Sequence, residues 1–225
     1  MKRFGLVVLG LVLVGVGAPP VGSQQGGGSK VSTSYDKPEG AELLAGPSRY
    51  EWQRPDRVIG LLAVREGEKI ADIGAGMGYF TNSLSQLVGA TGRIYAVETD
   101  ARLVRYLERE NEGHFFDNTV VVQATDGDLG LPTDGTLDLV LAVNTWHRFG
   151  KRGPALDSVR RALKPGGRFV IVDWHDGEIP IAPPVEERLS LSTLIAEMKG
   201  DGWTVTTNSR LLKYQYLVIF TPPAP

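Results

Sequence analysis

The chain has 225 residues, 42% hydrophobic and 22% charged, which excludes a disordered or fibrous protein and is enough for one well-filled domain. The absence of cysteine excludes disulfides and a lipid-modified N-terminal cysteine. A formal net charge of -2 argues against nonspecific binding to nucleic acid, which needs clustered Lys and Arg.

The first residues have the layout of a secretory signal peptide. Lys2 and Arg3 precede an uncharged, mostly apolar run over 4–18, followed by prolines and small residues up to Ser23. The run is short for a membrane span, which needs about 20 apolar residues. We therefore expect residues 1–23 to be removed and the protein to be exported, to the periplasm in a cell that has one, without a stable membrane span after processing. The alternative is an uncleaved N-terminal membrane anchor.

Residues 24–47 are rich in Gly, Ser and Gln near their start and are interpreted as a flexible linker and N-terminal segment ahead of a domain over 48–221. Within that domain apolar strands alternate with amphipathic helices, a pattern typical of a doubly wound, mostly parallel α/β sheet. The predicted parallel strands cover 69–73, 93–98, 119–123, 137–143 and 168–173.

The predicted helices between these strands have recognisable caps and buried faces. Asp100 and Ser190 are candidate N-caps, and Pro154 suits a first helical turn. The residues expected to face the core are Phe80, Leu84, Leu87 and Val88; Leu103 and Leu107; Leu156, Val159 and Leu163; and Leu191, Leu194, Ile195 and Met198. Two final strands, 203–207 and 216–220, are joined too closely for a parallel crossover and should form an antiparallel hairpin at the sheet edge. Seven strands are expected in all.

The segment "ADIGAGMGYF" places Gly74, Gly76 and Gly78 directly after the first of these strands. In such a sheet, ligands bind beyond the carboxyl ends of the strands, and glycines let the backbone approach them closely. Glu98 ends the next strand, at the separation where a carboxylate accepts hydrogen bonds from ribose hydroxyls. The pattern indicates nucleoside binding, although a tight turn without a ligand has the same glycines.

Asp72 distinguishes between two cofactors. A carboxylate before the first glycine repels the pyrophosphate of a dinucleotide, whereas the aminoacyl part of S-adenosylmethionine carries an ammonium group that a carboxylate attracts. The segments "ADIGAGMGYF", "IYAVETD", "LPTDGTLDLVLAVNTWHRF" and "LKPGGRFVIVDW" follow in the order and spacing of the class I S-adenosylmethionine-dependent methyltransferases. With "EWQRPDRV" and "LLKYQYLVIF", the chain resembles a bacterial subgroup of that superfamily over roughly residues 48–221.

This resemblance implies a Rossmann-like methyltransferase fold, S-adenosyl-L-methionine as cofactor and an unidentified methyl acceptor. Asp72 would lie near the methionine ammonium, and Glu98 would bind the ribose. In the segment after the third strand an acid would accept the adenine amino group; Asp126 is the first choice, with Thr125 and Asp128 as alternatives. Asp138 resembles a position that is largely architectural. The cofactor set is Asp72, Gly74, Gly76, Gly78, Glu98, Asp126 and Asn144.

The chemistry is expected beyond the fourth and fifth strands. Asn144 and His147 follow the fourth strand and His175 follows the fifth, so these three are the catalytic candidates. A general base is needed only for an acceptor that must lose a proton, and the histidines otherwise fix their loops. Asp173, His175 and Asp176 are too close in sequence to suffice for a metal, and no metal site is predicted.

Other aromatic and basic residues have two interpretations each. Arg49, Trp52, Arg54 and Pro55 form either a lid over the cofactor or a simple packing segment, and Tyr214 and Tyr216 line an acceptor pocket or belong to the edge hairpin and core. The sequence therefore predicts a methyltransferase. The alternatives are a cofactor-binding module without turnover and a nicotinamide-dependent oxidoreductase, which Asp72 and the glycine spacing disfavour. Export leaves open how a cofactor made in the cytoplasm reaches the protein.

Overall fold

One mixed sheet organises the computed structural model, which describes residues 47–112, 117–125, 127–209 and 212–223. Its strand order is β3-β2-β1-β4-β5-β7-β6, and β1 to β5 pair in parallel. β7 is antiparallel to both β5 and β6. The predicted doubly wound α/β fold with an antiparallel C-terminal pair is thus confirmed. The strands are β1 (Lys69–Ile73), β2 (Arg93–Glu98), β3 (Thr119–Gln123), β4 (Leu137–Val143), β5 (Leu163–Trp174), β6 (Thr204–Ser209) and β7 (Gln215–Thr221).

The first four strands have the predicted bounds, but β5 begins five residues earlier than expected. Leu163 pairs with Leu137, and the pairing resumes at Arg168 opposite Leu139 after a register shift. The Lys-Pro-Gly-Gly segment between them therefore interrupts the strand without ending it. Leu163 is buried with Leu156 and Val159 as expected, but its backbone belongs to β5 and not to the preceding helix.

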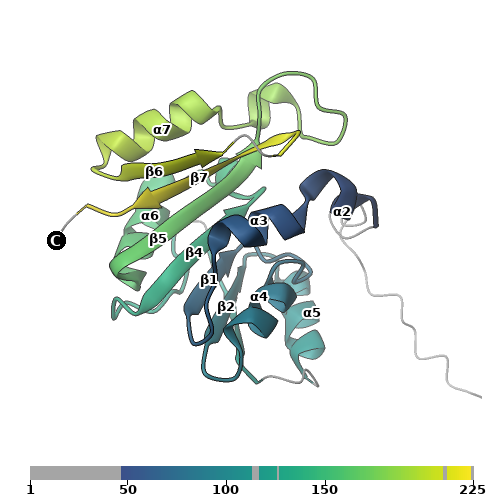
Figure 1. Cartoon of the computed structure of the whole chain (residues 1–225), viewed down its shortest axis with the longest axis vertical. Coiled ribbons are helices and arrows are strands. Elements are labelled where there is room, and N and C mark those ends of the chain that lie inside the picture. The colour runs from purple at the N-terminus through teal and green to yellow at the C-terminus, as the bar shows by residue number, and fades with distance from the viewer. Residues whose placement is uncertain (1–46, 113–116, 126, 210–211, 224–225) are drawn as a thin grey trace, which may run out of the picture. The chain divides into compact units, whose positions relative to one another are not determined.

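Helices cover both faces of the sheet (Figure 1). One face carries α3 (Pro55–Leu62), α4 (Thr81–Val88) and α5 (Ala101–Asn111), whose apolar residues pack with those of β1 and β2. The other carries α6 (Arg152–Ala162) and α7 (Leu191–Gly200), which share a larger cluster with β4, β5 and β7. Short elements complete the described chain: α2 (Pro47–Gln53), η1 (Trp146–Arg148) and η2 (Val185–Glu187).

The predicted caps are confirmed at two helices. The Asp100 side chain accepts a hydrogen bond from the Arg102 N–H, and the Ser190 hydroxyl accepts one from the Thr193 N–H. One residue of a predicted face is misplaced, because Leu87 is 43% exposed while its neighbour Val88 is buried. Thr81, Leu84 and Val88 form the buried face of α4, and Leu87 lies outside it.

The segment before the first strand forms two helices that the sequence analysis did not predict as such. Arg54 separates α2 from α3 with a left-handed backbone, at φ 48°. Pro55 then begins α3, where the missing proline N–H costs no helical hydrogen bond. This kink lets α3 pack Val58 and Leu62 against the sheet while α2 lies at the carboxyl ends of the strands.

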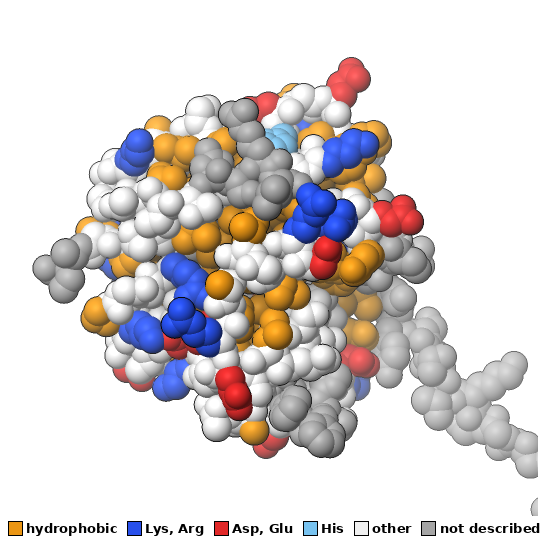
Figure 2. Space-filling model, in the orientation of Figure 1, with side chains coloured by type: hydrophobic (Ala, Val, Ile, Leu, Met, Phe, Trp, Pro, Cys, Tyr) orange, Lys and Arg blue, Asp and Glu red, His pale blue; other side chains and the backbone are white. Residues whose placement is uncertain are grey.

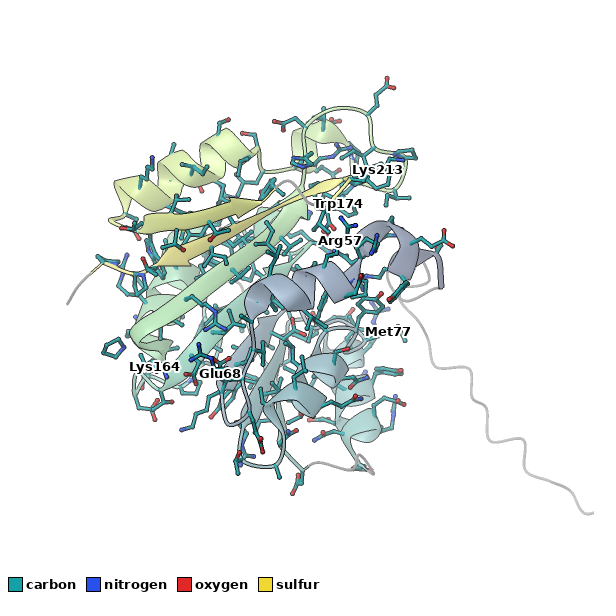
Figure 3. The ribbon with its side chains drawn as sticks, in the orientation of Figure 1. Arg57, Glu68, Met77, Lys164, Trp174 and Lys213 are labelled. Atoms are coloured by element: carbon teal, nitrogen blue, oxygen red, sulfur yellow. The ribbon has the colours of Figure 1, made fainter. Side chains whose placement is uncertain are left out.

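The two ends of the sheet differ in role. Figure 3 shows Met77 and Trp174 toward one end and Glu68 and Lys164 toward the other. Asp138 lies at the second, amino end, where its carboxylate accepts the Lys69 N–H at 2.8 Å and pairs with Lys164. Asp138 is therefore architectural, as the resemblance implied. None of the described helices is both long and apolar enough to cross a membrane.

Candidate functional site

The glycine-rich loop begins where β1 ends and is held against β2. The N–H groups of Gly74 and Ala75 donate to the Val97 carbonyl at 2.8 and 3.1 Å. Gly74 and Gly76 both have positive φ, at 71° and 59°. A Cβ on Gly74 would overlap the Thr145 side chain, with Thr145 Cβ 2.7 Å away, whereas a Cβ on Gly76 would meet nothing nearer than a carbonyl oxygen at 3.9 Å. Packing therefore requires glycine at position 74, while the space beside Gly76 is open.

Glu98 fastens this loop to the end of β2. One of its carboxylate oxygens accepts the Gly76 N–H at 3.0 Å, and the other accepts the N–H groups of Thr99 and Asp100 at 2.7 and 3.1 Å. A carboxylate has about four lone-pair sites, so the oxygen that faces Gly76 retains capacity for a further donor. Glu98 and the open side of Gly76 are thus neighbours, as a ribose subsite requires.

Asp72 is a buried acid, only 3% exposed, under the same loop. Its carboxylate accepts a hydrogen bond from the Thr81 hydroxyl at 2.7 Å. Burial raises the pKa of Asp72 to about 6, although the Thr81 hydrogen bond and the charge of Arg49 both oppose that rise. The ionised form of Asp72 therefore destabilises the folded protein when no ligand is bound. A cationic group placed beside the carboxylate would stabilise its charge.

Asn144 follows β4 with a left-handed backbone, at φ 54°. Its amide nitrogen donates to Gln53 at 3.2 Å and its oxygen accepts from Gln215. Gln53 in turn donates to Gln215 at 2.5 Å, so three side-chain amides from α2, β4 and β7 form a closed ring of hydrogen bonds. This amide ring fixes α2 over the strand ends.

His147 lies in η1 and forms a buried pair with Asp173 at the end of β5. The two atoms His147 Nδ1 and Asp173 Oδ1 are 2.7 Å apart, and the side chains are 5% and 1% exposed. Asp173 also accepts the backbone N–H groups of His147 and Trp174 at 3.1 and 3.0 Å. A carboxylate that accepts from Nδ1 leaves Nε2 of a neutral imidazole as the acceptor, which is the arrangement of an oriented base.

The other predicted histidine, His175, is half-buried beside Tyr216, whose ring centroid lies 6.0 Å from its own. Tyr216 is fully buried and donates its hydroxyl to the Leu189 carbonyl at 2.9 Å, so it belongs to the core rather than to an acceptor pocket. Arg188 shapes the loop that follows. Its guanidinium donates to the carbonyls of His175, Gly177 and Pro183.

Two tryptophans connect α2 to the end of β5. Trp52 and Trp174 stack with ring centroids 5.3 Å apart and planes 29° apart. The indole nitrogen of Trp52 is buried without a hydrogen-bond partner in the described part of the chain. Together with Arg49 and Gln53, Trp52 makes α2 a cover over the strand ends, which favours the lid interpretation of this segment.

The predicted adenine acid, Asp126, lies outside the described residues. Of the two alternatives, Thr125 and Asp128 form an isolated antiparallel bridge, and the Asp128 carboxylate accepts the Gly130 N–H at 3.0 Å. Asp128 is thus used in closing the turn after β3. Across the described ranges, no group of three or more His, Cys, Asp or Glu side chains is arranged to hold a metal ion.

The structure brings most of the predicted residues to one end of the sheet: Asp72, Gly74, Gly76 and Gly78 follow or end β1, Glu98 ends β2, Asn144 and His147 follow β4, and His175 follows β5. Sequence reasoning missed Gln53, Gln215, Thr81 and Thr145, which hold these residues in place. Gln215 stands between two tyrosines in "LLKYQYLVIF", so a polar residue within a mostly apolar and aromatic motif was the available signal there. Gln53 stands among charged residues in "EWQRPDRV", which gives no such signal.

Comparisons with known proteins find methyltransferases. The protein-L-isoaspartate O-methyltransferase of Aeropyrum pernix is 35% identical over 118 residues, which are 51% of this chain and 42% of that protein. The ubiquinone/menaquinone biosynthesis C-methyltransferase UbiE of Pseudomonas aeruginosa is 28% identical over 189 residues, 82% of this chain and 69% of that protein. The chain thus spans less than half of the first relative and about two thirds of the second.

Solved structures share the fold. A methyltransferase from Aquifex aeolicus described as S-adenosylmethionine-dependent has a TM-score of 0.74 and 26% identity, with 80% of this chain and 97% of that chain covered. The glycopeptide N-methyltransferase MtfA, solved with S-adenosylmethionine, has a TM-score of 0.61 at 16% identity over 76% of this chain and 87% of its own, which shows the fold alone.

A family profile, that of the methyltransferase domain, matches residues 65–212, about two thirds of the chain. The matched range runs from just before β1 to just before β7 and includes the glycine-rich loop, Glu98 and the ends of β4 and β5. The chain therefore belongs to the methyltransferase-domain family.

Proposed function

We propose that this protein transfers a methyl group from S-adenosylmethionine to an acceptor that approaches from the carboxyl ends of β4 and β5. The observation that carries the proposal is the open space beside Gly76, bordered by the Glu98 carboxylate. The backbone at φ 59° already favours glycine at this position, and no side chain fills the space beside it, so a ligand has room there. Asp72 then faces the methionine ammonium, Glu98 accepts from the ribose, and Asp126 remains the predicted adenine partner.

The bound cofactor supplies a methyl group on a cationic sulfur, which is already a good electrophile. The protein's task is therefore chiefly to hold the acceptor in line, and positioning of this kind contributes roughly 7 to 11 kcal/mol to catalysis. For an acceptor that carries a proton, His147 Nε2 is the proposed base, and Asp173 orients its ring through Nδ1. Asn144 and His175 complete the proposed acceptor side.

A second candidate function rests on one observation. The side chains of Asn144 and His147 are already engaged, by the amide ring and by Asp173. A protein that binds the cofactor without turning it over would show the same engagement.

The proposal does not specify which atom of the acceptor is methylated, because the similar proteins named above include an O-, a C- and an N-methyltransferase.

Two measurements on the purified full-length protein test these functions. Isothermal titration with S-adenosylmethionine, S-adenosylhomocysteine and NAD should give binding of the first two alone; binding of NAD alone would support the oxidoreductase alternative. Transfer of a labelled methyl group to extracts of the source cell should then give a labelled product. If the cofactor binds and no extract is labelled, the binding module becomes the better account.

Replacing Glu98 tests the ribose assignment. Glu98→Ala removes the acceptor for three backbone N–H groups as well as the proposed ribose contact, and should weaken binding of S-adenosylhomocysteine by about 1 to 3 kcal/mol. Glu98→Gln keeps an acceptor oxygen and should lose less. Affinities measured by titration and unfolding curves for each variant separate the two effects. Unchanged affinity in Glu98→Ala would contradict the ribose contact.

The role of His147 is tested on methyl transfer to an acceptor found in the extracts. In Asp173→Asn the His147 ring loses the carboxylate that orients it, and the rate of methyl transfer at pH 7 should fall about tenfold while the affinity for S-adenosylhomocysteine is kept. The exposed Asp176→Asn is the matched control. A loss of cofactor affinity as large as the loss of rate in Asp173→Asn would indicate a purely structural pair.

Export and partners are proposals that rest on the sequence. Lys2, Arg3 and the apolar run over 4–18 support removal of residues 1–23 and export, with an uncleaved anchor as the alternative. Cell fractionation and the mass of the mature N-terminus test this.

We propose a methyl acceptor other than a nucleic acid. Figure 2 shows Lys and Arg side chains in separate groups, with apolar and neutral side chains between them.

A further inference from the structure

A cavity of about 390 Å³, which we term the α4–α5 cavity, lies between two helices on one face of the sheet (Figure 1). Small-molecule sites in proteins commonly have volumes of roughly 300 to 1,000 Å³. The apolar part of its lining consists of Leu107, which is buried, and of Met77 and Val121, which are half-buried. The cavity is therefore large enough for a small organic molecule with an apolar body.

The α4–α5 cavity is separate from the proposed cofactor and acceptor subsites. Met77 comes from the glycine-rich loop, and every other residue that lines the cavity belongs to α4, α5 or β3. Glu98, Asn144 and His147 are not among the lining residues. The cavity thus adjoins the glycine-rich loop from the side of the helices, and the proposed methyl transfer does not account for it.

Three polar side chains of the lining have no partner within the described part of the chain. Asn82 and Gln86 belong to α4, and Glu110 belongs to α5. No hydrogen bond or ion pair joins their side chains to another described residue, and all three are exposed, so water satisfies them in the free protein. Asn82 and Gln86 are four residues apart and share one face of their helix. No lining residue is positively charged. A ligand in the cavity therefore meets two amides and one carboxylate.

This lining favours one class of ligand. An ammonium group is attracted by the Glu110 carboxylate and can donate to carboxylate and amide oxygens, whereas an anion is repelled. Leu107 and Val121 favour an apolar body, and the thioether of Met77 makes favourable contacts with aromatic rings. We propose that the α4–α5 cavity binds a small aromatic amine, with its ring against the apolar lining and its ammonium at Glu110. This inference goes beyond the proposed function, because methyl transfer does not require a second ligand site.

The simpler alternative is a cavity that holds water alone. Two probes with the same ring separate these accounts: tryptamine, whose side chain ends in an ammonium, and indole-3-propionate, whose side chain ends in a carboxylate. Both are titrated calorimetrically into the full-length protein at low ionic strength, where charge attraction is screened least. Glu110→Gln removes the negative charge and Glu110→Lys reverses it. Glu108→Gln removes an exposed acid of the same helix that does not line the cavity, and is the matched control.

We expect the unaltered protein and Glu108→Gln to bind tryptamine at least about fivefold more tightly than indole-3-propionate, because Glu110 attracts one probe and repels the other. Glu110→Gln should bind the two probes within about twofold of each other, and Glu110→Lys should prefer indole-3-propionate. Absence of tryptamine binding to the unaltered protein, equal affinities for the two probes, or a preference for tryptamine that persists in Glu110→Gln would overturn the assignment.

A second titration tests whether the α4–α5 cavity is separate from the cofactor site. Tryptamine should bind with unchanged stoichiometry to protein that has been saturated with S-adenosylhomocysteine. Competition between the two ligands would place the amine in the cofactor site and overturn the proposal. The comparison of the two indole probes uses no cofactor. A failure of S-adenosylhomocysteine to bind would therefore contradict the proposed function alone, and the probe titrations would still decide the amine site.

Discussion

Gly76→Ala is expected to lose at least about tenfold in affinity for S-adenosylhomocysteine while costing only about 1 to 2 kcal/mol of the free energy of unfolding. The added methyl group meets no atom of the protein within 3.8 Å, since the nearest is a carbonyl oxygen at 3.9 Å. The backbone at φ 59° is one that alanine adopts at modest cost. The methyl group would therefore project into the space that the cofactor is proposed to fill.

Gly74→Ala should show the opposite behaviour. Its Cβ would overlap the Thr145 side chain at a backbone φ of 71°, so strain and overpacking add to about 3 kcal/mol or more of destabilisation. Denaturant unfolding and isothermal titration on both variants measure the two quantities. Gly166→Ala is the matched control, with positive φ and open space but at the amino end of the sheet. If Gly76→Ala and Gly166→Ala bind equally well, the open space beside Gly76 is not a ligand site.

These two glycines show what the sequence can and cannot predict. The alternation of apolar runs predicted both ends of β1, β2, β3 and β4 without error, because each strand is a short, mostly apolar run bounded by polar or turn residues. The same pattern placed Asp72 and Glu98 at strand ends. It could not separate the packing role of Gly74 from the open position of Gly76, since that distinction depends on Thr145, which is about seventy residues away in the chain.

Long-range polar contacts were equally out of reach. The amide ring joins Gln53 to Gln215, which are 162 residues apart in the sequence. The hydrogen-bonded pair of His147 and Asp173 joins residues 26 positions apart. Neither separation leaves a periodic signal. The α2 segment was considered as a lid, but its helical form and the kink at Arg54 were not predicted, because tertiary contacts to the strand ends decide such short elements.

Asp72→Asn is expected to make the cofactor-free protein more stable and its cofactor affinity weaker. The acid has a pKa of 3.8 when unfolded and about 6 when folded, so the folded state holds the extra proton between these values. Stability is therefore lost as pH rises from about 4 to about 6, by roughly 3 kcal/mol in all. Asparagine imitates the protonated acid. The variant should gain up to about that amount at pH 7.5 and almost nothing at pH 4.

The same titration predicts how binding responds to pH. The cofactor's ammonium attracts the ionised acid, so affinity for S-adenosylhomocysteine should rise as pH increases through about 6 and level off above it. The charges that act on Asp72 are those of Arg49, which favours ionisation, and Glu98, which opposes it. Titrations from pH 5 to 8 should give a sloping profile for the unaltered protein and for the exposed control Asp134→Asn, and a flat, weaker one for Asp72→Asn. An affinity independent of pH in the unaltered protein would mean that the ammonium binds away from Asp72. The space beside Gly76 would then hold some other part of the cofactor. Ionised Asp72 would destabilise the folded protein, and cofactor binding would not compensate for this.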